Sequence, residues 1–125
     1  MEFIIVGIGG FIGSCLRYGF NKFAIYLNIS FPLGTLMSNV VAGVAIGFII
    51  GLETNTFSFS PKTKLFLTTG LLGGLSTFSS FSIETVTLFN DGKHLLAAGN
   101  ILLNLILSLS GVVLGMAAAR LLNKN

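Results

Sequence analysis

The chain of 125 residues is 53% hydrophobic and only 9% charged, whereas about a quarter of the residues in an ordinary soluble domain are charged. So few charged side chains could not cover a surface in water, which excludes a soluble globular domain. The formal net charge is +3, but the basic residues are scattered singly and form no patch that could follow a phosphate backbone. We therefore expect an integral membrane protein whose surroundings are a lipid bilayer, with no nucleic-acid partner.

The first predicted span runs from Phe3 to Leu27 and exceeds the roughly 20 helical residues that cross a bilayer. Its start lacks the basic segment and the cleavage site of a secretory signal, so we expect the span to remain. Gly9 and Gly13 share one helix face, which favours close helix packing. A dinucleotide-binding loop is disfavoured because Ile12 occupies the place of its third glycine. Arg17 is either an interfacial anchor or the counter-charge of a buried acid.

The second predicted span, Phe31 to Leu52, contains no charged residue, and Pro32 at its start suits the first turn of a helix. Small and polar residues recur every four positions and so follow one face; they are Thr35, Asn39, Gly43, Gly47 and Gly51. An asparagine amide in hydrocarbon is costly unless it finds hydrogen-bond partners or water. This face therefore predicts a polar neighbour for Asn39. The mixed segment from Glu53 to Lys64 is predicted to be a loop.

The third predicted span, Leu65 to Phe89, contains a Gly- and Ser-rich stretch that disfavours a continuous helix. The residues that weaken it are Gly73, Gly74, Ser76, Thr77, Ser79 and Ser80. Irregular backbone at membrane depth is tolerated only where protein or water surrounds it, so we expect a break at the centre of an assembly. Carbonyl groups exposed there could hold a cation.

Three further side chains of the third span could take part in ion transport. Phe78 and Phe81 are three residues apart beside the expected break. They either pack as ordinary apolar residues or place their electropositive ring edges along a narrow anion path. Glu84 is the only acid well inside a span, and it is either a functional carboxylate or a hydrogen-bonded structural group near the membrane face.

A tight turn at Asn90 to Gly92 leads into the fourth predicted span, Leu95 to Leu122. Asn100, Asn104 and Ser108 recur every four residues and could face the polar row of the second span. Two interpretations remain open, either hydrogen bonds between helices or the wall of a solute path. Donors without a carboxylate beside them suit an anion better than a cation. The lone histidine, His94, has no ligand cluster around it and is expected at the membrane interface.

The basic residues are almost balanced between the two ends of such a bundle. With both termini on one side, that side holds Lys62, Lys64, Arg120 and Lys124, and the other holds Arg17, Lys22 and Lys93. An excess of Lys and Arg normally sets the orientation of a membrane protein. The near balance permits insertion both ways and hence an antiparallel homodimer; the alternative is one fixed topology set by a small bias.

Three motifs resemble signatures of the Fluc, or CrcB, family of fluoride channels and occur in the same order along the chain. The resemblance covers nearly the whole chain. They are GGFIGSCLRY in the first span, GTLMSN in the second and GGLSTFSSFSIE in the third. The resemblance implies one four-span domain over residues 1–125, without enzymatic activity, in the plasma membrane of a prokaryote. It further implies a dual-topology homodimer that exports cytoplasmic fluoride passively through two pores, with a structural sodium ion at its centre.

The resemblance also implies roles for particular residues. Phe78 and Phe81 correspond to the phenylalanines that line the pore, Asn39 to the pore asparagine, and Arg17 to the arginine that ends the first-span motif. Carbonyl groups of Gly73 and Ser76 from both chains would hold the sodium ion. The remaining residues assigned to the fluoride pathway are Thr35, Thr77, Ser80, Glu84, Asn104 and Ser108. Many relatives have threonine at the position of Ser80, and serine keeps the hydroxyl group.

The main alternative is a proton-coupled exporter of the small multidrug-resistance type, which also has four spans and dual topology. Such exporters rely on a glutamate inside the first span. Here Glu2 lies at the very start and the next acid is Glu53. A purely structural or holin-like membrane protein is a third possibility, but it would not need a Gly- and Ser-rich break beside two phenylalanines.

Overall fold

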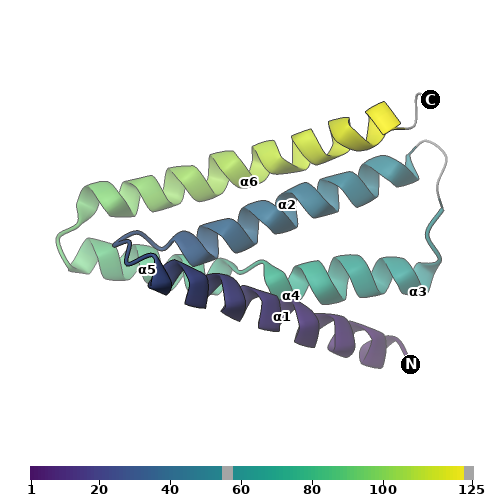
Figure 1. Ribbon diagram of the computed structural model, residues 1–125, viewed down its shortest axis with the longest axis horizontal. Coiled ribbons are helices and arrows are strands. Elements are labelled where there is room, and N and C mark those ends of the chain that lie inside the picture. Colours follow the sequence, from purple (N-terminus) through teal and green to yellow (C-terminus); the bar gives the residue numbers. More distant parts are fainter. Residues whose placement is uncertain (55–57, 123–125) are drawn as a thin grey trace.

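The computed structural model describes residues 1–54 and 58–122. Its helices in chain order are α1 (Glu2–Tyr26), α2 (Leu33–Glu53), α3 (Pro61–Lys64), η1 (Leu65–Leu72), α4 (Gly73–Leu75), α5 (Phe78–Asn90) and α6 (His94–Leu122). Four helical stretches are long and apolar enough to cross a membrane, namely α1, α2, Pro61–Asn90 and α6. Consecutive stretches run in opposite directions, so the start of α1 and the end of α6 lie at one end of the bundle (Figure 1). Lys124, counted above among the charges of that end, lies outside the described residues.

The loop before the third stretch is shorter than the sequence predicts. We expected a loop from Glu53 to Lys64, but α2 includes Glu53 and α3 begins at Pro61. Ser60 caps α3 by accepting a hydrogen bond from the Thr63 backbone N–H at 3.2 Å, and proline fits the first helical position. The prediction of a loop over residues 61–64 is therefore wrong; residues 55–57 of that loop lie outside the described part of the chain.

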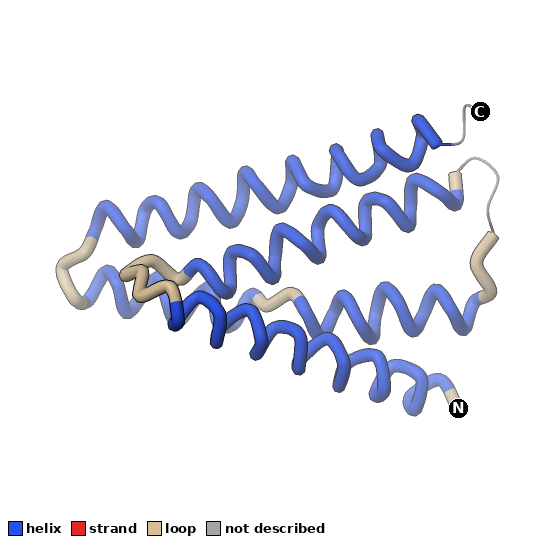
Figure 2. The backbone as a smooth tube through the Cα atoms, viewed as in Figure 1, coloured by secondary structure: helices blue, strands red, loops and turns tan. Residues whose placement is uncertain are grey.

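The third stretch has several local geometries. After α3 comes η1, a π-helix, the wider helical turn in which each N–H bonds five residues back. The short helix α4 then ends at Leu75, and α5 begins at Phe78. Between them, Ser76 (ψ 153°) and Thr77 (φ −153°, ψ 120°) have extended backbone conformations. Figure 2 shows this non-helical segment as a tan stretch in the interior of the third stretch, away from either end.

Glycine allows two helix pairs to pack with their backbones in contact. In α1, a Cβ atom added at Gly9 would lie 2.7 Å from the Phe66 carbonyl oxygen, and one added at Gly13 would overlap the Leu71 carbonyl. In α2, one added at Gly43 would lie 2.7 Å from the Ser108 carbonyl oxygen of α6. The close packing predicted for Gly9 and Gly13 is confirmed, and α2 with α6 forms the most extensive pair.

The apolar residues divide between a small core and a large outer surface. Ala42, Leu72 and Leu75 are buried, with Phe20 packed against them. Outside the bundle, α1 exposes large side chains such as Phe3, which is 92% accessible. An apolar exterior of this kind is stable in lipid rather than in water, as expected for membrane-spanning helices.

Candidate functional site

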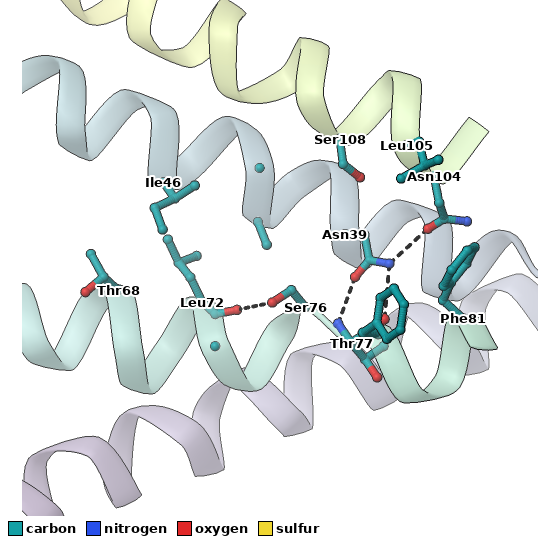
Figure 3. A pocket seen from close by; sticks show the side chains of 14 residues that line it. Asn39, Ile46, Thr68, Leu72, Ser76, Thr77, Phe81, Asn104, Leu105 and Ser108 are labelled. Atoms are coloured by element: carbon teal, nitrogen blue, oxygen red, sulfur yellow. Dashed lines mark hydrogen bonds between the residues drawn. The ribbon is translucent and has the colours of Figure 1, made fainter. Parts of the chain in front are cut away.

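A cavity of ≈ 400 Å³ lies between α2, α6 and the non-helical segment of the third stretch (Figure 3). Its polar lining residues are Asn39, Thr68, Ser76, Thr77, Asn104 and Ser108, and its aromatic ones are Phe78 and Phe81. Among the described residues that line it, none carries a formal charge. The cavity therefore offers hydrogen bonds and ring edges without a carboxylate that would repel an anion.

Asn39 connects all three elements around the cavity. Its Oδ1 accepts a hydrogen bond from the Thr77 backbone N–H at 2.8 Å. Its Nδ2 donates to the Thr77 carbonyl at 3.3 Å and to Asn104 Oδ1 at 2.9 Å. Figure 3 shows the Asn39 amide directed at the non-helical segment, with Asn104 on its other side. The predicted polar neighbour of Asn39 is thus found twice, in the third stretch and in α6.

Thr77 fixes the start of α5 at the cavity wall. Its Oγ1 accepts a hydrogen bond from the Ser80 backbone N–H at 3.2 Å and donates to Ser80 Oγ at 3.1 Å. This is an N-cap, in which a hydroxyl satisfies an N–H group of the first helical turn. Ser80 itself does not line the cavity. Because the N-terminal end of a helix carries partial positive charge, α5 makes the neighbouring wall more favourable to an anion.

The two phenylalanines lie side by side at the cavity. The ring centroids of Phe78 and Phe81 are 5.4 Å apart, with the ring planes tilted by 52°. Phe78 is 77% exposed, so it is not held as an ordinary core residue within a single chain. A tilted pair of this kind presents ring edges as well as faces.

Asn104 is held by Asn100, a member of the same polar row that was not among the residues assigned to the fluoride pathway. Its Nδ2 donates to both the backbone carbonyl and Oδ1 of Asn100, each at 2.9 Å. Asn100 is fully buried, and its Nδ2 donates to Thr85 Oγ1 at 2.9 Å. The sequence analysis missed Thr85. The residue spacing could have indicated it, because Phe81 and Thr85 follow the N-cap Thr77 at intervals of four and so lie on the same side of α5.

Thr35 and Glu84 form a second polar contact outside the cavity. Thr35 is fully buried, and its hydroxyl donates to Glu84 Oε1 at 2.6 Å. Within the described residues, the other carboxylate oxygen, Oε2, is buried without a hydrogen-bond partner. The structure therefore brings these two predicted residues to each other, but neither lines the cavity.

Ser108 and Arg17 differ in their relation to the site. Ser108 lines the cavity, and its buried Oγ has no hydrogen-bond partner in the described part of the chain. Its hydroxyl hydrogen is therefore not committed to another described residue. Arg17 is half-buried in α1 and does not line the cavity. The structure does not bring Arg17 to Glu84, the acid for which it was the candidate counter-charge.

Gly73 and Ser76, the predicted cation ligands, both line the cavity. In a continuous helix the Thr77 N–H would donate to the Gly73 carbonyl, but here it donates to Asn39. The Gly73 carbonyl oxygen is thereby left without its helical donor and open to another partner. Within the described residues, no group of three or more His, Cys, Asp or Glu could hold a metal. The oxygen atoms that this region could offer to a cation are those of backbone carbonyls and hydroxyl groups.

Comparison with known proteins gives a consistent assignment. The profile of the family described as CrcB-like protein, Camphor Resistance (CrcB), matches residues 4–116. A protein of Clostridium novyi (strain NT) named fluoride-specific ion channel FluC is 50% identical over 119 residues, which cover 94% of this chain and 93% of that protein.

Two further relatives bear the same name. The protein of Clostridium perfringens (strain 13 / Type A) is 46% identical over 95% of this chain and 94% of its own length. The protein of Elusimicrobium minutum (strain Pei191) is 43% identical over 97% of this chain and 95% of its own length. With four candidate spans, the chain is a multi-pass protein of the prokaryotic cell membrane, and it belongs to the CrcB-like protein family.

Proposed function

We propose that this protein is a passive fluoride-selective channel through which cytoplasmic fluoride leaves the cell. The observation that carries the proposal is the name fluoride-specific ion channel FluC, borne by relatives that match more than nine-tenths of the chain. The chemistry of the cavity supports it, since the lining offers hydroxyl, amide and ring-edge positive charge and, among the described residues, no carboxylate.

Fluoride is strongly hydrated, so a narrow path must replace the water that the ion loses with many partial positive charges. Ser108 can donate its free hydroxyl hydrogen, and the edges of Phe78 and Phe81 add electrostatic attraction. Asn39 can donate one Nδ2 hydrogen to the ion in place of its hydrogen bond to the Thr77 carbonyl, because that 3.3 Å bond is the longest of its three. Thr35 and Glu84 lie further along the same path in this proposal, and Arg17 at its mouth.

The working unit in this proposal is an antiparallel homodimer with two pores. Gly73 and Ser79 are exposed on a single chain, beside the non-helical backbone of the third stretch. The backbone carbonyl of the exposed Gly73 lacks its helical donor, and unsatisfied backbone groups are not tolerated against lipid, so this face needs protein to cover it. A second copy in the opposite orientation would cover it, and would place the two breaks together at the membrane midplane. The nearly balanced Lys and Arg counts at the two ends permit that orientation.

A structural sodium ion fits the residues at this proposed dimer centre. The Gly73 carbonyl lacks its helical donor, and hard cations prefer oxygen ligands. Gly73 and Ser76 of both chains would hold the ion through their backbone carbonyls. When bound, it would supply a central positive charge that holds the two third stretches together.

Passive fluoride efflux from liposomes that contain only the purified protein tests the proposed function. A channel lets fluoride run down its gradient at a rate that does not depend on an imposed proton gradient. The proton-coupled exporter would instead move substrate against its gradient when protons flow back. Absence of fluoride efflux from vesicles with correctly inserted, folded protein would refute the proposal, and chloride-loaded vesicles are the control for leakage.

A further inference from the structure

We infer that Thr85 and Asn100 are positioning residues that set which side of the Asn104 and Asn39 amides, oxygen or NH₂, faces each neighbour. Neither residue lines the cavity. They act through a directed series of hydrogen bonds that begins at the Phe81 carbonyl and ends at the Thr77 N–H. The flux measurements below rest on the proposed function, whereas the measurements of amide orientation do not.

The series begins with a hydroxyl group that has a single orientation. The Thr85 hydroxyl donates its hydrogen to the Phe81 carbonyl at 2.8 Å. Because that hydrogen is committed, Thr85 Oγ1 can only accept from the next residue. It accepts from Asn100 Nδ2 at 2.9 Å. The amide of Asn100 must therefore direct its NH₂ group at α5 and its oxygen along α6.

The oxygen of Asn100 then determines the orientation of Asn104. Asn104 Nδ2 donates to Asn100 Oδ1 and to the Asn100 backbone carbonyl, so both of its hydrogens are committed. Only the oxygen of Asn104 remains for Asn39, whose Nδ2 donates to it at 2.9 Å. Asn39 must in turn direct its own oxygen at the Thr77 N–H. Because Asn100 is fully buried and does not line the cavity, water does not replace a missing partner of Asn100.

The orientation of the Asn39 and Asn104 amides determines which of their atoms an anion in the cavity meets. Both amide oxygens that belong to lining residues, those of Asn39 and Asn104, are covered by N–H donors. An anion in the cavity therefore meets no bare side-chain carbonyl. Without the Thr85 hydroxyl, nothing would force Asn100 to keep its NH₂ group toward α5. An inverted Asn100 would offer a donor to Asn104, which would favour an inverted Asn104. The NH₂ group of Asn104 would then face the NH₂ group of Asn39, so Asn39 would lose the acceptor that holds its orientation.

The test replaces Thr85 by valine, which keeps the shape of the side chain and removes the hydroxyl. Fluoride flux through Thr85→Val should fall by about tenfold or more, since a buried donor loses its partner. Thr85→Ser, which keeps the hydroxyl, should restore flux to within about twofold of the parent. Thr87→Val is the matched control, because Thr87 is exposed on the same helix and does not line the cavity.

Two measurements separate positioning from simple packing. In protein labelled with ¹⁵N-asparagine, the side-chain NH₂ signals of Asn104 and Asn39 should shift in Thr85→Val and return in Thr85→Ser. In an Asn104→Ala background, where the series is already cut, Thr85→Val should change flux by less than about twofold. Asn100→Leu is the second variant, because it cuts the series while leaving the Thr85 hydroxyl bonded to Phe81.

Unchanged asparagine signals in both Thr85→Val and Asn100→Leu would overturn the inference. A full tenfold effect of Thr85→Val in the Asn104→Ala background would overturn it as well, because it would identify a packing defect. If the parent protein conducts no fluoride, the proposed function fails. The asparagine signals still decide the positioning role in that case, since they are recorded without transport.

Discussion

Among single residues, the phenylalanines have the most direct test. Phe78→Ile and Phe81→Ile keep an apolar side chain but remove the electropositive ring edge beside the cavity. Each should lower fluoride flux far more than it lowers expression or dimer formation. Phe66→Ile is the control, because Phe66 belongs to the same stretch and does not line the cavity. Flux within about twofold of the parent in both variants, a barrier change of only about 0.4 kcal/mol, would identify the rings as packing residues.

Ser108 provides a second test at this scale. Its buried Oγ has no partner in the described part of the chain, so its hydrogen is available to an anion without breaking another hydrogen bond. Ser108→Ala should therefore lower flux by roughly ten- to hundredfold, the effect of losing one hydrogen bond to a charged group. Protein stability should change little. Ser110→Ala, at an exposed position of the same helix, should conduct like the parent, and equal flux in both variants would contradict the role of Ser108.

Residue spacing predicted part of this site but not its hydrogen-bond pattern. The four-residue recurrence in two spans correctly predicted a polar neighbour for Asn39, because recurrence every four residues defines a helix face. It could not predict that Asn39 also binds both backbone groups of Thr77. That contact needs the extended backbone at Ser76 and Thr77, which depends on how α1, α2 and α6 pack around it. Thr85 was missed because a threonine on a helix usually bonds its own backbone, as Thr85 also does.

At the scale of helices, the length and hydropathy of the apolar segments correctly predicted the four stretches. The ends were less predictable, and α3 shows why. Its four residues, Pro61–Lys64, contain two lysines and were assigned to a loop, yet Ser60 and Pro61 form a helix start. An ion pair of 2.8 Å between Lys64 and Glu53 joins this end of the third stretch to the end of α2. The π-helical geometry of η1 had no signal in the sequence.

The contact between α2 and α6 yields a prediction about stability. A Cβ atom at Gly47 would overlap the Val112 carbonyl oxygen, so Gly47→Ala must push the two helix backbones apart. We expect a loss of about 1–3 kcal/mol in unfolding free energy, the usual cost of overpacking, measured by detergent-titrated unfolding. Gly7→Ala is the matched control, because a Cβ atom there has no neighbour within 4 Å. Equal stability of the two variants would show that this contact does not require glycine.

For the whole molecule, the proposed central sodium ion predicts a dependence on the cation present. If carbonyls of Gly73 and Ser76 from two chains hold it, complete replacement of sodium by a large organic cation should weaken the dimer and lower flux together. Dimer content is measured by glutaraldehyde cross-linking in vesicles, and flux by efflux from the same vesicles. Loss of ²³Na signal from the protein confirms that the buried ion has exchanged. Full dimer content and full flux after complete exchange would refute a structural role for sodium.

The proposed antiparallel arrangement requires insertion in both orientations, which the near balance of Lys and Arg permits, and disturbing that balance tests it. The start of α1, α3 with Lys62 and Lys64, and the end of α6 with Arg120 lie at one end of the bundle (Figure 1). The other end has the end of α1 with Lys22, and Lys93 just before α6, while Arg17 lies further inside α1. Because Lys and Arg favour the cytoplasmic side, a few lysines added at the C-terminus should place every copy in one orientation. Such a variant cannot form antiparallel dimers and should lose fluoride flux at normal expression. Co-expression with a variant that carries the extra lysines in the turn before α6 should restore flux, because the two then insert oppositely. Full flux from the singly biased variant alone, with its C-terminus found on one side only, would show that a parallel arrangement suffices.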